Sequence, residues 1–301
     1  MKKQFALISD SSCDLPQELA KEKEVRVVPF YVTFDGEQYF KEGVEMSGEE
    51  FYERAIGDPK TIPKTSMPSI QDFADAFIPF VKNGEKVVCI CISTKFSGSY
   101  DSARNARELV LEEYPDACIA VIDARVNTVL QADYVLEAVR LRDQGISPEE
   151  SVERLLEIRD SGRIFFTVGN LDYLIAGGRI GKVASVAGSV LGLRPVITLK
   201  EGEIFASGVG RSRRSTLSKC AELLVKYVKE NNAVPGEWVL DIGYGADHEE
   251  ALQFREQIVT ALHEAGFMIR PEDIPIFRIG AAIAVHTGPY ALGVTILKKA
   301  V

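Results

Sequence analysis

The chain has 301 residues, of which 46% are hydrophobic and 26% are charged, a balance typical of a globular protein with a sizeable core. Its formal net charge of −9 disfavours binding to a nucleic-acid backbone or to anionic lipid headgroups. Only a short apolar run precedes Asp10, and no apolar stretch approaches the ~18 residues of a membrane helix. We therefore expect a cytoplasmic protein with no nucleic-acid partner and no stable membrane insertion.

The first half of the chain alternates apolar runs with amphipathic patterns. Strands are predicted over 5–9, 25–34, 86–93 and 117–123. Helices are predicted between and after them, over about 16–23, 47–56, 69–82, 98–112 and 127–143, with Ser47 and Ser69 as N-caps. This alternation indicates a parallel sheet covered by helices on both faces, which is a three-layer α/β/α arrangement.

The pattern changes after a predicted helix over 144–162. A glycine-rich helical segment lies between the next two predicted strands, and two long helices follow. The strands are predicted over 163–168, 194–199, 237–245, 274–280 and 291–299, and the long helices over 212–230 and 248–264. We expect a mixed sheet with helices on one face, which gives a two-layer α/β domain over 163–301 after a first domain over 1–162.

The five cysteines and three histidines exclude several chemistries. Cys89 and Cys91 fall in one apolar run, where two residues of a strand share a face but suit a disulfide poorly. We interpret them as small core residues in a reducing compartment, with a redox role as the alternative. No metal is expected, because no cysteine or histidine spacing suits zinc. The sequence also lacks G-x-S-x-G, the motif that carries the nucleophilic serine of α/β-hydrolases.

Polar loops follow three of the predicted strands of the first half, at 9–16, 93–103 and 123–128, and a fourth loop over 63–69 leads into a helix. Ligands of open α/β sheets bind beyond the carboxyl ends of the strands. Ser97 and Gly98 begin a helix there, where free backbone N–H groups can bind an anion. Thr65 and Ser66 offer two hydroxyls. The alternative for both pairs is an ordinary capping loop.

His286 ends the apolar run 281–286, just before a Gly-Pro turn, and we expect it at the mouth of a strand. There it would be a donor to an anion or a general base, and a structural histidine is the alternative. A Ser–His–Asp triad would need Ser97 or Ser11 beside it, and nothing in the local sequence supports that. His248 and His263 lie near acids on helix patterns, and we expect both on the surface.

Two segments carry noteworthy arginines. The glycine-rich segment 174–185 contains Arg179 but matches no phosphate-binding motif. The segment 208–215 gathers Arg211, Arg213 and Arg214 in an otherwise acidic chain. Those three residues are either a solvated helix start or a docking patch for an acidic partner or a phosphate.

Six segments taken together resemble the DegV family, the fatty-acid-binding subunits of bacterial fatty acid kinase. Each is weak alone, but their order and separations are specific, and they extend over nearly the whole chain. They are DSSCDLP at 10–16, TSMPS at 65–69, FSGSYDSA at 96–103, LDYLIAGGRIG at 171–181, LGLRPVITLKEGEI at 191–204 and HTGPYALG at 286–293.

The resemblance implies a DegV-like fold of two α/β domains with a long-chain fatty acid held in a tunnel between them. It implies no cofactor and no catalysis by this chain alone. A separate ATP-dependent kinase subunit would phosphorylate the bound carboxylate, as part of phospholipid metabolism. The ligand-binding residues that we expect are Thr65, Ser66, Ser97, Gly98, Arg179, His286 and Thr287. Arg211, Arg213 and Arg214 are the expected docking residues for the kinase.

Two positions depart from the family pattern. Val209 stands where a lysine is frequent, which bears on partner docking, and Tyr290 stands where a small residue is frequent, which we expect to reshape the pocket near the headgroup. Two alternatives stay open. One is a standalone acyl hydrolase or transferase that uses Ser97 and His286. The other is a substrate-binding subunit like that of dihydroxyacetone kinase, which a polar pocket without an apolar tunnel would favour.

Overall fold

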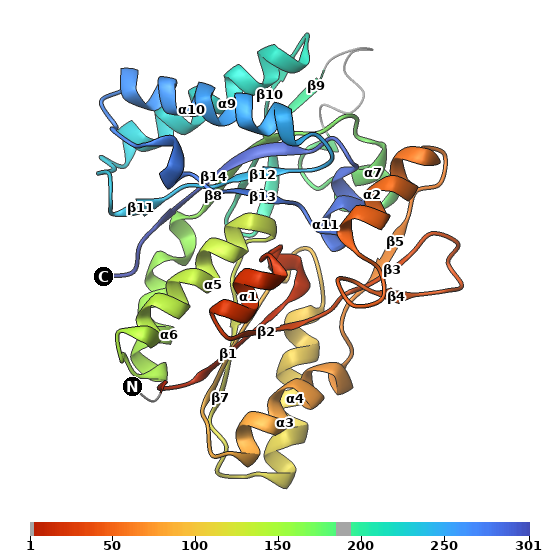
Figure 1. Cartoon of the computed structure of the whole chain (residues 1–301), viewed down its shortest axis with the longest axis vertical. Coiled ribbons are helices and arrows are strands. Elements are labelled where there is room, and N and C mark those ends of the chain that lie inside the picture. The colour runs from red at the N-terminus through yellow and green to blue at the C-terminus, as the bar shows by residue number, and fades with distance from the viewer. Residues whose placement is uncertain (1–2, 185–193) are drawn as a thin grey trace.

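The computed structural model describes residues 3–184 and 194–301 (Figure 1). The first half contains a four-stranded parallel sheet with strand order β2-β1-β6-β7. Its strands are β1 (Ala6–Asp10), β2 (Val25–Val28), β6 (Val87–Cys91) and β7 (Ile119–Asp123). β1 and β6 are buried at every residue, which agrees with apolar runs that pack on both faces of a parallel sheet.

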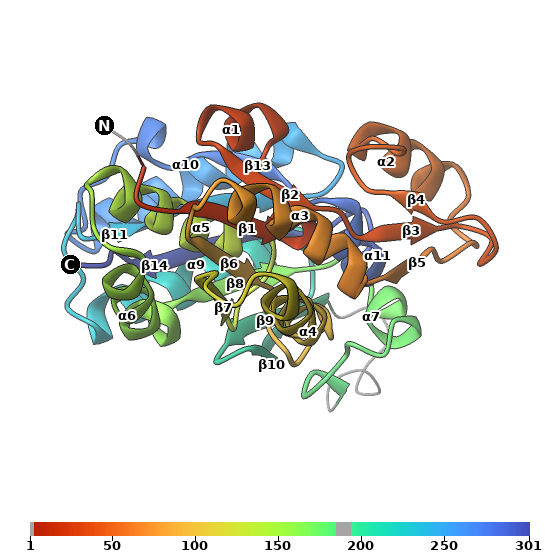
Figure 2. The ribbon, with the colours of Figure 1, turned by 90° about the horizontal axis from the view of Figure 1, so that it is seen from below.

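Helices cover both faces of this sheet, so the predicted three-layer arrangement is confirmed (Figure 2). Ala6 and Ile8 pack with α3 and α4, whereas Leu7, between them, packs with the core that α1, α5 and α6 share. The helices are α1 (Gln17–Glu22), α3 (Ile70–Lys82), α4 (Ser99–Glu113), α5 (Thr128–Asp143) and α6 (Pro148–Ile158). Ser47 and Ser69 cap their helices as predicted, since each side-chain oxygen accepts a backbone N–H three residues on.

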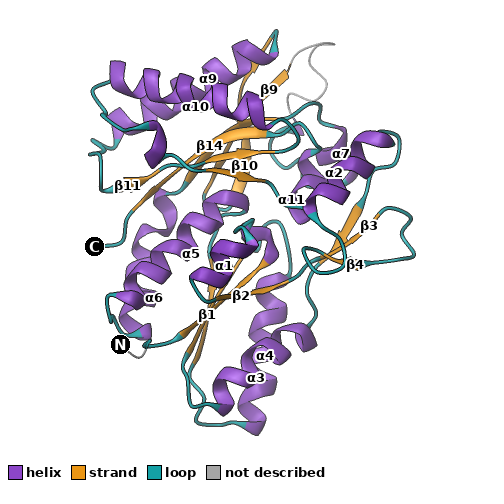
Figure 3. Cartoon of the chain, viewed as in Figure 1, coloured by secondary structure: helices purple, strands orange, loops and turns teal. Residues whose placement is uncertain are grey.

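The second half contains a mixed sheet with strand order β10-β9-β8-β14-β12-β13, and β11 pairs with β14. Only the β12–β13 pair is parallel. The strands are β8 (Arg163–Thr167), β9 (Arg194–Lys200), β10 (Glu203–Gly210), β11 (Trp238–Val239), β12 (Ile242–Tyr244), β13 (Ile276–Arg278) and β14 (Leu292–Lys298). α9 (Arg213–Glu230) and α10 (His248–Glu264) cover one face, as expected (Figure 3).

A small three-stranded sheet, β4-β3-β5, corrects one prediction. The single strand predicted over 25–34 is two strands, because the chain leaves the parallel sheet at Pro29, which has no N–H to donate to a strand partner. β3 (Tyr31–Thr33) then pairs with β4 (Phe40–Lys41) and with β5 (Lys64–Ser66), in a segment predicted to be a loop. α2 (Gly48–Gly57) lies beside this sheet (Figure 1).

The apolar run that leads to His286 is a helix, not a strand, so that expectation is wrong. α11 (Ala281–Thr287) is rich in alanine, the best helix former, and Gly280 precedes it in extended conformation. Gly288, at φ +74°, ends the helix, and its N–H donates to the Ala284 carbonyl at 2.7 Å. Between β8 and β9, α7 (Asp172–Ala176) is the described helix of the glycine-rich segment, and residues 185–193 lie outside the described part of the chain.

The two halves meet along α5, which packs against the second sheet from the face opposite α9 and α10 (Figure 1). Thr295 Oγ1 of β14 donates to Asp133 Oδ2 of α5 at 2.8 Å and accepts the Asp241 N–H at 3.0 Å. Burial raises the pKa of Asp133 to about 6, and burial together with the Asp133 charge raises the pKa of Asp241 further above its usual range.

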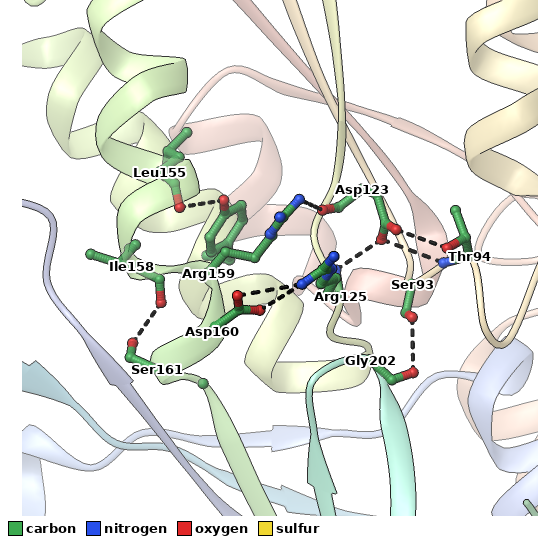
Figure 4. Close-up of polar contacts among 12 residues, drawn as sticks. Ser93, Thr94, Asp123, Arg125, Leu155, Ile158, Arg159, Asp160, Ser161 and Gly202 are labelled. Carbon is green, nitrogen blue, oxygen red and sulfur yellow. Dashed lines mark hydrogen bonds and ion pairs between the residues drawn. The ribbon is translucent and has the colours of Figure 1, made fainter. Parts of the chain in front are cut away.

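The tip of the β9–β10 hairpin makes a second junction (Figure 4). Ser93 Oγ, after β6, donates to the Gly202 carbonyl at 2.9 Å. Arg125, after β7, lies against Gly202 and pairs with Asp160 of its own half at 3.2 Å. Every strand of the parallel sheet precedes residue 162 and every strand of the mixed sheet follows it, but one apolar core cluster crosses between them. The division into domains 1–162 and 163–301 stays a prediction.

All five cysteines are free, and Cys118 alone among them is exposed. Cys89 Sγ and Cys91 Sγ lie 3.8 Å apart in the buried interior of the parallel sheet. Within the described residues, no helix combines the length and the apolar character that a membrane span requires.

Candidate ligand-binding site

A cavity lies between the carboxyl edge of the parallel sheet and the inner face of the mixed sheet. It holds about 1060 Å³ of space between atoms, counting the solvent at its opening. Half of the residues that line it are large apolar side chains from both halves of the chain: Phe30, Met67, Ile92, Phe96, Val129, Ile164, Phe166, Leu174, Leu199, Ile204, Ile279, Ile283 and Leu292. An elongated apolar molecule therefore fits these walls.

Thr65 and Ser66 point to opposite sides of β5. Thr65 is paired with Val32, which is fully buried, and lines the cavity. Ser66 is paired with Tyr31, is exposed, and is not among the lining residues. Because successive side chains of a strand alternate between its faces, only one of the two hydroxyls reaches the ligand space. The structure thus separates Thr65 from Ser66, which we expected to act together.

Ser97 and Gly98 both line the cavity, at the N-terminus of α4. The Ser97 hydroxyl oxygen accepts the Ser99 N–H at 3.2 Å. A Cβ atom on Gly98 would lie 2.8 Å from the Met67 sulfur, so the methionine side chain packs closely against this glycine. The 15-residue α4 therefore directs its N-terminus, which favours anions, toward the same space as Thr65.

His286 lies at the C-terminal end of α11 and faces Thr65. The distance from its Nε2 to Thr65 Oγ1 is 3.3 Å. Its Nδ1 is buried and has no hydrogen-bond partner among the described residues, and the ring lies against Gly177. Burial, and secondarily the charge of Arg179, lowers the pKa of His286 to about 4. The imidazole is therefore neutral at pH 7 and can donate one N–H without carrying a charge.

Arg179 and Thr287 complete the polar end of the cavity. The Arg179 side chain is exposed, and two carbonyls hold it: Nε donates to Phe96 at 3.2 Å and a terminal nitrogen donates to Gly177 at 2.6 Å. Thr287 lines the cavity while its hydroxyl lies 3.4 Å from the Ile283 carbonyl of its own helix. Because Met67 and Arg179 are exposed, this polar end is also where the cavity opens to solvent.

A family model described as "Uncharacterised protein, DegV family" matches residues 4–299 of this chain. The chain belongs to the DegV family. A DegV domain-containing protein of Caldanaerobacter subterraneus is 31% identical over 98% of this chain and 99% of its own length. One from Staphylococcus aureus is 27% identical over 99% of this chain and all of its own length.

Solved structures share this fold over nearly their whole length. A stearic acid-binding protein from Eubacterium ventriosum is 44% identical, covers 98% of both chains and superposes with a TM-score of 0.91. A DegV family protein from Thermus thermophilus, described by its fatty acid binding, is 28% identical, covers 98% of this chain and 99% of its own, and has a TM-score of 0.85. The predicted family and fold class are confirmed.

A buried aspartate that sequence reasoning did not single out organises the floor of this DegV site. Asp10 accepts hydrogen bonds from Ser12 Oγ at 2.5 Å, Gln131 Nε2 at 2.9 Å, Ser99 Oγ at 2.7 Å and the Ile92 N–H at 3.1 Å. Burial raises its pKa, and these donors oppose the shift. The signal was present, since Asp10 ends a buried strand and begins a polar run.

Two further acids, the buried Asp14 and the partly buried Glu42, hold the helix that carries His286. Glu42 accepts the Ala282 N–H at 3.0 Å and the Ser11 hydroxyl at 2.5 Å. Asp14 accepts the Thr128 hydroxyl at 2.5 Å and lies with Glu42 against Gly280. Burial raises the pKa of both acids, and for Asp14 the charge of Glu42 adds to the effect. Glu42 directly follows β4, so α11 is fixed to the small sheet that also carries Thr65.

The three candidate docking arginines differ in their surroundings. Arg213 forms two hydrogen bonds with Glu250, at 2.8 and 2.7 Å, and is partly buried. Arg211 and Arg214 are exposed. Arg213 is therefore engaged within the DegV fold, whereas the other two present their charge to solvent. Val209 lies in β10, and its carbonyl accepts from the Lys219 ammonium.

Tyr290 does not shape the cavity, so that expectation is wrong. It is half-exposed, packs against Gly169 and lines a separate, smaller pocket with Tyr173. His248 and His263 are exposed, as expected.

Proposed function

We propose that this chain binds one long-chain fatty acid in the cavity, with its carboxylate beside Thr65, Ser97 and His286. The observation that carries the proposal is an apolar cavity that ends at neutral donors from three separated segments. A tail of about 15 methylenes gains roughly 12 kcal/mol on burial at ~0.8 kcal/mol per methylene. Association and ordering costs remove a large part of that gain. Two solved proteins of the same fold are described as fatty-acid-binding, which supports this ligand class.

The polar end suits a carboxylate that has to remain reactive. A buried carboxylate without partners takes up a proton or returns to water. Here the hydroxyls of Thr65 and Ser97, one neutral imidazole and the N-terminus of α4 provide donors. Arg179 supplies a positive charge while two carbonyls hold it. A bidentate arginine would occupy both carboxylate oxygens. Neutral donors leave one oxygen free to act as a nucleophile.

We propose further that the chain is a carrier and presents this carboxylate to a separate, ATP-dependent kinase subunit in the cytoplasm. The polar end of the cavity opens to solvent beside Arg179, where a partner can reach the carboxylate. Arg211 and Arg214 are the proposed contacts for that kinase because they are exposed. Arg213 contributes to the fold through Glu250 instead.

The test combines this chain, radiolabelled palmitate, ATP and the kinase subunit of a fatty acid kinase. We expect palmitate to bind the chain alone and acyl phosphate to form only when both proteins are present. Arg211→Glu combined with Arg214→Glu should slow acyl phosphate formation without changing palmitate binding. Arg104→Glu, at an exposed site on α4, is a matched charge reversal that should change neither. Acyl phosphate made by the chain alone would contradict the carrier role.

The geometry does not favour the two alternatives. A hydrolase would need Ser97 activated by His286, but the Ser97 oxygen accepts from Ser99, and His286 Nε2 contacts Thr65. Among the described residues no acid orients His286 through Nδ1. A sugar-binding subunit would need a polar pocket, whereas half of the lining here is large and apolar.

A further inference from the structure

One polar side chain in the cavity is not used by the proposed carboxylate site. Asn127 stands between β7 and α5 and lines the cavity. Its amide makes no hydrogen bond with any residue that the structure describes. Asn127 is partly buried. A ligand that supplies a partner to its amide gains affinity over one that leaves the amide unpaired.

The backbone conformation prevents the Asn127 amide from capping its helix. Asn127 is the N-cap of α5, and an asparagine at that position normally accepts an N–H from the first turn. Here no such bond forms, because Thr128 follows at φ +51°, a left-handed conformation that a β-branched residue rarely adopts. The Thr128 hydroxyl, bonded to Asp14 at 2.5 Å, holds this conformation. The turn leaves the Asn127 amide free on the cavity wall.

This amide lies well away from the carboxylate end. Asp14, which binds Thr128, lies against Gly280 at the start of α11, whereas His286 is near the end of that helix. Six residues at ~1.5 Å each separate Gly280 from His286, a rise of about 9 Å. On the other side, the Ser93 N–H donates to the Val126 carbonyl at 3.0 Å, and Ser93 lies four residues before Ser97 in the loop that joins β6 to α4. Several methylenes of a bound chain would lie between the two polar sites.

We propose that Asn127 binds an oxygen substituent along the acyl chain, so that the ligand class includes fatty acids with a mid-chain hydroxyl or keto group. This inference rests on the proposed function, since it requires an acyl chain in the cavity. The amide can donate its N–H to a keto or hydroxyl oxygen and can accept a hydroxyl proton. The inference adds a specificity residue that is separate from the carboxylate donors.

The test measures binding of stearic acid and of hydroxystearic acids with the hydroxyl at C2 or between C6 and C12, each to the lipid-free full chain. Asn127→Leu replaces the amide by an apolar group of similar size. It should bind stearic acid at least as tightly as the unmodified chain. It should weaken binding of the best mid-chain hydroxystearic acid by about five- to tenfold. The affinity for the C2 isomer should change by the same factor as the affinity for stearic acid.

Asn105→Leu, on the exposed side of α4, is the matched control and should change none of these affinities. The inference is overturned if the ratio of hydroxystearic to stearic affinity is the same in the Asn127→Leu variant and the unmodified chain across the whole series. Equal loss for every acid would also overturn it, because that indicates a general packing defect. If no acid binds the unmodified chain, the proposed function fails together with the inference. If stearic acid binds and only the ratio is insensitive, the inference fails alone.

Discussion

Replacing Gly177 by alanine tests whether the position of His286 governs ligand binding. Gly177 has φ −76° and ψ −6°, a right-handed conformation that alanine adopts without strain. A Cβ atom there would lie 2.2 Å from His286 Nδ1, whereas ordinary van der Waals contact begins near 3.4 Å. The ring must therefore retreat by about 1.2 Å, the difference between those two distances.

That retreat has a direct consequence for the polar end of the cavity. His286 Nε2 already lies 3.3 Å from Thr65 Oγ1, close to the limit of a hydrogen bond, so a shift of this size disturbs the alignment of the imidazole with Thr65. Loss of one aligned donor to a buried carboxylate corresponds to about 1–3 kcal/mol, which is roughly 5- to 150-fold in affinity. The fold should tolerate the change, because the backbone conformation at Gly177 is ordinary.

The assay is calorimetric titration of lipid-free protein with palmitate, alongside a thermal melt. Gly178→Ala is the control. Gly178 has φ +65° and no atom near its would-be Cβ, so alanine there strains the backbone but does not touch His286. We expect weaker palmitate binding in Gly177→Ala, and in Gly178→Ala a lower melting temperature with palmitate affinity preserved. Unchanged palmitate affinity in Gly177→Ala would refute the role given to the His286 ring.

Three further predictions follow from the site and from the junction between the halves. Thr65→Val should weaken palmitate binding by about 1–3 kcal/mol while Ser66→Ala leaves it unchanged, and equal effects would contradict the inward and outward orientations of these two residues. The His286 ring should titrate near pH 4 by NMR in the ligand-free protein, and a midpoint near 6.5 would show that the ring is not buried as described. Because the pKa values of Asp133 and Asp241 are raised, this pair binds more protons in the folded protein than in the unfolded chain between about pH 4 and 6. Their contribution to the unfolding free energy is therefore lost as pH rises, by up to ~1.4 kcal/mol per pH unit for each proton. Asp133→Asn should flatten this slope in urea titrations at several pH values, and an unaltered slope would remove the pair as its source.

The sequence predicted correctly those features that local residue patterns along the chain determine. β1 and β6 are continuous apolar runs because both faces of the parallel sheet are covered. Ser47 and Ser69 marked helix starts because capping is a local interaction. Thr65, Ser97 and His286 were predicted as ligand contacts through the resemblance to the DegV family, and the structure brings all three to one cavity.

The remaining features depend on contacts between distant segments. A short apolar run such as 281–286 fits a strand or a buried helix equally well, and only the packing of α11 decides. The difference between Thr65 and Ser66 depends on the register of β5 against β3, which no local pattern shows. Glu42 is indistinguishable from an ordinary surface acid in the sequence and becomes a partly buried anchor of α11 only through the tertiary fold.

Mass spectrometry of lipid extracted from the purified chain tests the central claim most directly. The proposed function predicts one fatty acid of about 14–20 carbons per chain, either carried through purification or taken up when palmitate or oleate is added. A chain that yields no such acid and takes up neither would contradict the assignment of this cavity to a fatty acid.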